Sequence, residues 1–312
     1  MSETPIVFNR RAVRRNRDRA APGLDRHDYL LAETAERLLD RLDDVKRDFP
    51  TALDLGCRNG TLAARLGQDR RKRGGVRTLI QCDLSEKMAR AARAGESPRD
   101  PKEAATLAAP TLAADEEALP FAEGTFDLVL SSLALHWVND LPGTLVQIRR
   151  ALKPDGLFLA ALFGGETLKE LRGALTEADL ATSGGASPRV SPFAQVRDLG
   201  QLLQRAGFAL PVVDADTVTV AYADPAHLLA DLRGMGEANA TAARRKSFSR
   251  RALFAAALRN YPRAAALEGR VPATFQIVYL TAWAPHETQP KPLRPGSAKA
   301  SLAAALNDKD KT

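Results

Sequence analysis

Three aspartates stand at the ends of short apolar runs in this 312-residue sequence. Asp54 closes the first run, Asp83 follows the second and Asp115 follows the third. Such runs predict buried β-strands, and open α/β sheets bind their ligands just beyond the carboxyl ends of the strands. A carboxylate after the second strand can accept hydrogen bonds from both hydroxyls of a ribose. The pattern therefore predicts a site for a nucleoside-type cofactor.

A glycine turn follows the first of these runs. Gly56 and Gly60 enclose three residues, and the lack of a Cβ lets a glycine backbone approach a ligand closely. The stretch does not match the Gly-x-Gly-x-x-Gly pattern of dinucleotide-binding proteins. An ordinary strand-turn-helix unit, in which the glycines serve only packing, is the alternative interpretation.

The arrangement Asp54-x-Gly56-x-x-x-Gly60 resembles motif I of the class I S-adenosylmethionine-dependent methyltransferases. Arg58 departs from that motif, because it stands where the middle glycine belongs and places a side chain beside the cofactor. In that superfamily an aspartate in the place of Asp115 faces the adenine amino group. The resemblance implies S-adenosylmethionine (SAM) as the cofactor. Its expected contacts are Asp54, Gly56, Arg58, Gly60, Asp83 and Asp115.

Apolar runs alternate with segments of helical periodicity through the first half of the chain. The runs are 51–55, 78–82, 111–114, 125–132 and 157–163. This alternation predicts a parallel sheet with helices on both faces. Farther on, 212–214 and 217–222 alternate as a hairpin strand would, 244–266 is Arg/Ala-rich and predicted helical, and 274–283 is the last strand. With the resemblance, the predicted fold is α/β, a Rossmann-like methyltransferase fold with a mostly parallel seven-stranded sheet.

The composition is that of a globular protein, with 45% hydrophobic and 27% charged residues. No apolar run approaches the ~20 residues that a membrane span needs, and the N-terminus lacks the apolar core of a secretory signal. Cys57 and Cys82 are expected to be a reduced pair in a cytoplasmic, bacterial protein. We expect a basic N-terminal arm and helix (1–47), a methyltransferase domain (48–285) and a mobile C-terminal tail (286–312).

Six arginines gather in the first twenty residues, namely Arg10, Arg11, Arg14, Arg15, Arg17 and Arg19. Such a segment is typical of a mitochondrial presequence, and equally of a basic arm that contacts an acidic partner or an anionic membrane surface. A solvated amphipathic helix is the third interpretation. Apolar residues such as Phe8 and Val13 suggest that part of the arm docks on the domain. We expect a partner contact that is not removed.

His136 and Trp137 follow the fourth strand, in the crevice where this architecture binds its ligands. A tryptophan there can stack on an arginine guanidinium, and Glu166 or Glu237 can pair with the same group. His136, Trp137 and Glu166 are therefore the candidate catalytic residues, and structural packing is the alternative for each. The four histidines lack the His-x-Asp/Glu spacing of a non-haem iron site, so no metal site is predicted.

Five stretches resemble mitochondrial complex I assembly factor 5 and its bacterial relatives. They are 135–142, 163–168, 191–193, 231–239 and 271–279. The resemblance covers nearly the whole chain, and the biotin-pathway malonyl-carrier-protein methyltransferase is a more distant cousin. It implies a protein partner, a subunit of respiratory complex I. We expect no nucleic-acid partner and at most a peripheral place at the inner membrane.

The family leaves the reaction open. The mitochondrial protein keeps the methyltransferase fold but hydroxylates an arginine on an iron–sulfur subunit of complex I, whereas bacterial members are usually described as methyltransferases. Methyl transfer needs only proximity, in-line geometry and desolvation, so it leaves no fixed motif. The leading hypothesis is a SAM-binding, methyltransferase-fold enzyme that acts on a protein partner. The alternatives are an arginine hydroxylase, a non-catalytic SAM-binding assembly factor, and a carrier-protein or small-molecule methyltransferase.

Overall fold

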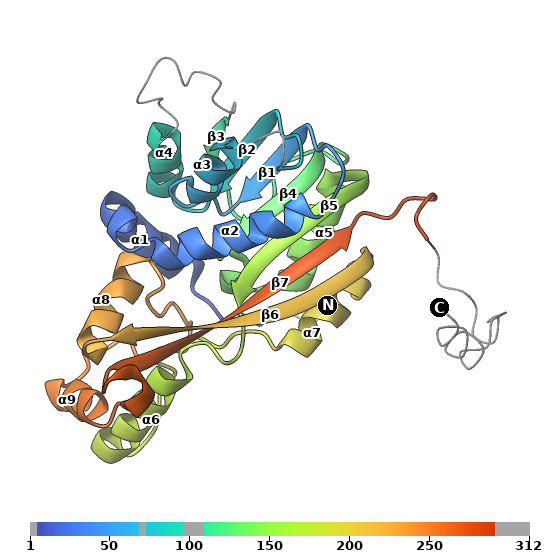
Figure 1. Cartoon of the computed structure of the whole chain (residues 1–312). Coiled ribbons are helices and arrows are strands. Elements are labelled where there is room, and N and C mark those ends of the chain that lie inside the picture. Colours follow the sequence, from blue (N-terminus) through green and yellow to red (C-terminus); the bar gives the residue numbers. More distant parts are fainter. Residues whose placement is uncertain (1–4, 69–72, 96–108, 291–312) are drawn as a thin grey trace, which may run out of the picture.

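The computed structural model describes residues 5–68, 73–95 and 109–290. The predicted tail therefore lies outside the described residues from position 291 onward. Figure 1 shows a twisted sheet with helices on both faces. Within the described ranges, no helix is both long enough and apolar enough to cross a membrane.

Seven strands form one sheet in the order β3-β2-β1-β4-β5-β7-β6. They are β1 (Thr51–Leu55), β2 (Thr78–Asp83), β3 (Thr111–Ala113), β4 (Phe126–Ser132), β5 (Leu152–Phe163), β6 (Ala209–Tyr222) and β7 (Val271–Trp283). The first five pair in parallel, and β7 is antiparallel to both β5 and β6. The predicted fold class, a mostly parallel seven-stranded α/β sheet, is confirmed.

The helices connect these strands and cover the two faces. They are α1 (Arg10–Ala20), η1 (Ala21–Arg26), α2 (Tyr29–Asp43), α3 (Thr61–Gln68), α4 (Glu86–Gly95), η3 (Leu135–Trp137), α5 (Leu141–Ala151), α6 (Lys169–Ser183), α7 (Val196–Arg205), α8 (Pro225–Gly234), α9 (Arg251–Arg259) and η4 (Ala265–Leu267). Successive side chains of a strand point to opposite faces. Thus Ala52 packs in the core under α2, while Leu53 packs in the core under α5 and α7.

Two predicted elements differ from the structure. The two predicted strand segments, 212–214 and 217–222, are joined in β6, a single 14-residue strand. Its alternation arises because one face is half-buried toward α2, where Asp214 and Asp216 pair with Arg41. The residues between them, such as Ala215 and Thr217, lie on the opposite face and are exposed. The predicted helix at 244–266 is only α9, Arg251–Arg259.

Helix α1 docks on the rest of the chain. Asn9 caps it, since its side chain accepts a hydrogen bond from the Ala12 N–H. Phe8 and Val13 are buried, and the Phe8 ring meets Trp137 edge-on at 5.3 Å. In Figure 1, α1 lies between α4 and α8. The arm is thereby held at the carboxyl ends of the first strands.

Candidate functional site

Asp54 lies near the end of β1 with its side chain sealed from solvent. Its exposed fraction is 1%, and neither carboxyl oxygen has a hydrogen-bond partner in the described part of the chain. Burial, reinforced by the charge of Asp83, raises the pKa of Asp54 to about 8. An unpaired buried carboxyl is costly, so a ligand that donates hydrogen bonds to it would relieve that cost.

The glycine turn makes two close contacts inside the protein. Gly56 and Gly60 both have φ of +82°, in the left-handed region that favours glycine. A Cβ on Gly56 would lie 2.1 Å from the Cβ of Ala134, and one on Gly60 would lie 3.2 Å from the Cα of Ala92. The turn therefore packs against the segment after β4 and against α4.

Arg58, the residue that departs from motif I, also has a left-handed backbone, with φ of +54°. Its side chain turns inward and is 2% exposed. The Nη2 atom donates to the Leu133 carbonyl at 2.7 Å and to a carboxylate oxygen of Glu237. Its Nε and Nη1 atoms have no hydrogen-bond partner among the described residues. Arg58 therefore lies beside the predicted cofactor position with unused donors.

Two arginines of α1 reach the acidic strand ends. Arg17 is fully buried, and its Nη1 donates to Asp83 Oδ1 at 3.2 Å and to Glu116 Oε1 at 2.6 Å. Arg10 donates to Asp115, to Glu116 and to the Trp137 carbonyl. The carboxylates predicted to hold ribose and adenine thus pair with the protein's own guanidinium groups.

Glu116 belongs to this arrangement, and the sequence interpretation passed it over as a turn residue. It is fully buried between Arg10 and Arg17. Burial alone raises the pKa of its carboxyl, but the charges of the two arginines outweigh burial and lower the pKa to about 2. The available signal was the run of three acids, Asp115-Glu116-Glu117, directly after a predicted strand.

Glu237 gathers three partners from distant parts of the chain. Besides Arg58, its carboxylate accepts from Trp137 Nε1 at 2.8 Å and lies 3.0 Å from His136 Nε2. Burial favours the neutral acid, but Arg58 and His136 outweigh it and lower the pKa of Glu237 to about 2. Burial lowers the pKa of His136 despite the neighbouring carboxylate. We call Arg58, His136, Trp137 and Glu237 the Glu237 cluster.

The three candidate catalytic residues do not share one place. His136 and Trp137 are in the Glu237 cluster, and Trp137 is 1% exposed beneath Phe8. Glu166 lies apart at the surface, where its side chain is 58% exposed and 3.5 Å from Lys169. Among the described residues, no group of three or more His, Cys, Asp and Glu side chains could hold a metal ion.

The residue types fit SAM, whereas the space requires a rearrangement. Asp83 and Asp115 end adjacent parallel strands, and the unpaired carboxyl of Asp54 suits an ammonium group. The cavity beside Asp54, Gly56 and Arg58 measures about 10 Å³, room for a single water at most. Arg10 and Arg17 of α1 already pair with Asp115 and Asp83, so a ligand that binds these two carboxylates would have to displace the two guanidinium groups.

Comparisons with known proteins identify the family of this chain. The family model described as a methyltransferase domain matches residues 53–160. The arginine-hydroxylase NDUFAF5, mitochondrial, of Danio rerio is 44% identical over 299 residues, which cover 95% of this chain and 88% of the relative. A malonyl-[acyl-carrier protein] O-methyltransferase of Gallionella capsiferriformans is 34% identical over 94% of this chain and 96% of its own length.

Among solved structures, a putative methyltransferase from Bacillus halodurans superposes with a TM-score of 0.55 at 14% identity, covering 81% of this chain and 100% of that one. Its likeness shows the fold. The identity to NDUFAF5 extends over nearly the whole chain. The chain therefore belongs to the class I SAM-dependent methyltransferase superfamily, in the family of the arginine-hydroxylase NDUFAF5.

Proposed function

We propose that this protein binds SAM at the carboxyl ends of β1, β2 and β3 and acts on a protein partner during the assembly of respiratory complex I. The observation that carries the proposal is the set of three aspartates at the ends of neighbouring parallel strands. Asp83 would accept the ribose hydroxyls, Asp115 the adenine amino group, and Asp54 the ammonium of the methionine end. The partner's identity rests on the family resemblance alone.

Bound SAM supplies an electrophilic methyl group on a sulfonium. The protein's share is to bind, to orient and to exclude water, which its buried strand ends favour. The names of the relatives indicate two candidate reactions, namely transfer of a methyl group and hydroxylation of an arginine. Mass spectrometry of the partner separates them, because the modified subunit gains either a methyl group or an oxygen atom.

Asp83→Asn should weaken SAM binding by roughly 10- to 150-fold, because hydrogen bonds to a charged acceptor contribute about 1.5–3 kcal/mol. Calorimetry would measure the affinity. The comparison is repeated in an Arg17→Gln background, since Asp83 also pairs with Arg17. Asp127→Asn is the matched control. Asp127 lies at the amino end of β4, away from the proposed SAM site, and pairs with Lys153. Equal affinities for Asp83→Asn and wild type would refute the ribose assignment.

SAM should accelerate tryptic cleavage within Arg10–Ala20, the reverse of the protection that ligands usually give. Trypsin cuts after arginine only where the backbone opens locally, and α1 must leave Asp83 and Asp115 before SAM can take them. Cleavage sites would be mapped by mass spectrometry with and without SAM. The acceleration should be absent in Asp83→Asn at the same SAM concentration. Protection of α1 by SAM would show that helix and cofactor bind together.

The exposed arginines of α1 should contact the partner. Arg11, Arg14 and Arg15 point to solvent, whereas Arg10 and Arg17 are occupied. Replacing the three exposed arginines by glutamine should weaken partner binding and reduce its salt dependence, because exposed charges are screened over about 8 Å at physiological salt. Pull-down with mass spectrometry at low and high salt measures both. If the triple variant recovers as much partner as wild type at low salt, the exposed arginines of α1 do not contact the partner.

Deletion of the gene should lower the amount of assembled complex I while biotin synthesis stays intact. A biotin requirement with normal complex I would favour a carrier-protein methyltransferase. The second candidate function is a non-catalytic assembly factor, which the pairing of Arg10 and Arg17 with the acidic strand ends favours. It predicts normal complex formation with a partner subunit that gains no mass.

A further inference from the structure

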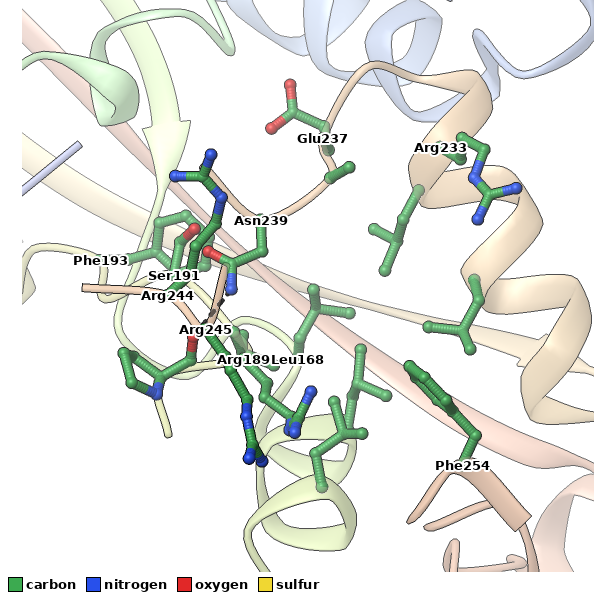
Figure 2. A pocket seen from close by; sticks show the side chains of 17 residues that line it. Leu168, Arg189, Ser191, Phe193, Arg233, Glu237, Asn239, Arg244, Arg245 and Phe254 are labelled. Carbon is green, nitrogen blue, oxygen red and sulfur yellow. Dashed lines mark hydrogen bonds between the residues drawn. The ribbon is translucent and has the colours of Figure 1, made fainter. Parts of the chain in front are cut away.

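A second cavity opens next to the Glu237 cluster, and Glu237 itself lines it. It measures about 290 Å³ and is walled by α6, the 188–193 segment, α8 and α9. Figure 2 shows Arg233 on one side and Arg244 on the other, with apolar side chains between them. This volume is close to the lower end of the range for small-molecule sites, about 300–1,000 Å³.

The floor of this cavity is aliphatic because two helices turn their apolar stripes toward it. Leu171 and Leu175 are four positions apart on α6, and Leu229 and Leu232 are three apart on α8. Residues at these spacings share one face of a helix. Phe254 of α9 closes the wall and remains 38% exposed. The cavity thus offers a continuous apolar surface to a hydrocarbon chain.

Its rim is cationic and largely uncompensated. Arg189 is satisfied by both oxygens of Asp179. By contrast, Arg233, Arg244 and Arg245 have no carboxylate partner in the part of the chain that the structure describes. Among the described residues, the side chain of Arg244 donates to the Thr241 carbonyl and that of Arg245 to the Ser247 hydroxyl. Three guanidinium groups are therefore available to a ligand.

The one carboxylate on the rim cannot offset them. Glu237 lines the cavity, but its two oxygens already accept from Arg58 and Trp137 and contact His136. The net field in the cavity is positive, which opposes a guanidinium or ammonium ligand and favours an anion. A guanidinium fork matches a carboxylate through two parallel hydrogen bonds.

We propose that this cavity is a binding site for an aliphatic carboxylate, with the hydrocarbon chain on the leucines of α6 and α8 and the carboxylate between Arg233 and Arg244. This cavity shares no lining residue with the cavity beside Asp54, Gly56 and Arg58. Binding is therefore measured on the full chain without SAM, so that the proposed function and this site can fail independently.

Calorimetry with octanoate, octylammonium and octanol tests the charge preference on the unmodified protein. Octanoate should bind to one saturable site at least tenfold more tightly than the other two, because charged hydrogen bonds add roughly 1.5–3 kcal/mol to the shared apolar contact. Octanol binding as tight as octanoate binding would show a merely apolar cavity. Tighter octylammonium binding, or octanoate uptake that does not saturate, would overturn the proposal.

Variants locate the site. Arg233→Gln combined with Arg244→Gln should weaken octanoate binding at least tenfold and leave octanol binding unchanged. Leu229→Gln should weaken both ligands, which a purely ionic surface contact would not do. Arg259→Gln is the control, since this exposed arginine of α9 does not line the cavity. Melting curves without ligand verify that each variant folds, and equal octanoate affinity in the double variant would refute the assignment.

Discussion

Glu237→Gln should lower the free energy of unfolding by about 3–5 kcal/mol, the usual cost of removing one partner of a buried ion pair. Arg58 is 2% exposed, and Glu237 is the carboxylate that its guanidinium contacts. The substitution leaves that charge buried without compensation and also weakens the bonds to His136 and Trp137. Urea unfolding at pH 7, followed by circular dichroism, measures the loss.

Two comparisons make this result specific. Glu166→Gln should change the stability by no more than about 0.5 kcal/mol, because Glu166 is a surface residue. Adding Arg58→Met to Glu237→Gln should recover part of the loss, since no unpaired charge remains buried. If the single Glu237→Gln variant is as stable as wild type, the cluster does not support the fold.

The pH dependence of the same variant follows from the pKa of Glu237, which is lowered from 4.5 to about 2. A depressed carboxyl pKa stabilises the fold above the ordinary value, and this stabilisation is lost as the pH falls through the folded-state value. The deficit of Glu237→Gln relative to wild type should therefore be full at pH 5 and shrink toward pH 2.

Parallel topology explains why the strand-end residues could be predicted. In a parallel sheet of consecutive βα units, the carboxyl ends of all strands lie on the same side of the sheet. Asp54, Asp83 and Asp115 follow neighbouring strands and therefore lie near one another. Asp54 and Asp83 are buried at the ends of buried strands, whereas Asp115 stays partly exposed after the half-exposed β3. No local pattern, however, indicated what would pair with them.

The partners come from far along the chain. Arg17 contacts Glu116 across 99 positions, and Trp137 contacts Glu237 across 100. Such pairs depend on how α1 and α8 dock on the sheet, which periodicity within one element does not encode. From the sequence, Glu237 was one of two candidates to pair with a substrate guanidinium, and in the structure this carboxylate pairs with Arg58 of the same chain.

Asp54→Asn should stabilise the protein at pH 8 by on the order of 5 kcal/mol and have little effect near pH 4. Burial, with the nearby charge of Asp83, raises the pKa of Asp54 from 3.8 to about 8. The folded state thus binds a proton that the unfolded state releases, so wild-type stability falls as the pH rises from about 4 to 8. Asparagine resembles the protonated acid and removes that penalty.

Urea unfolding of wild type and Asp54→Asn at pH 5, 6, 7 and 8 tests this. Burial lowers the pKa of His136, so this residue contributes to the pH dependence with the opposite sign. The difference between the two proteins cancels its contribution. A carboxyl retained at such a cost suggests a ligand that needs its charge. Asp54→Asn should accordingly be more stable than wild type and bind SAM more weakly. If both its stability and its affinity for SAM rise, Asp54 has no role in binding.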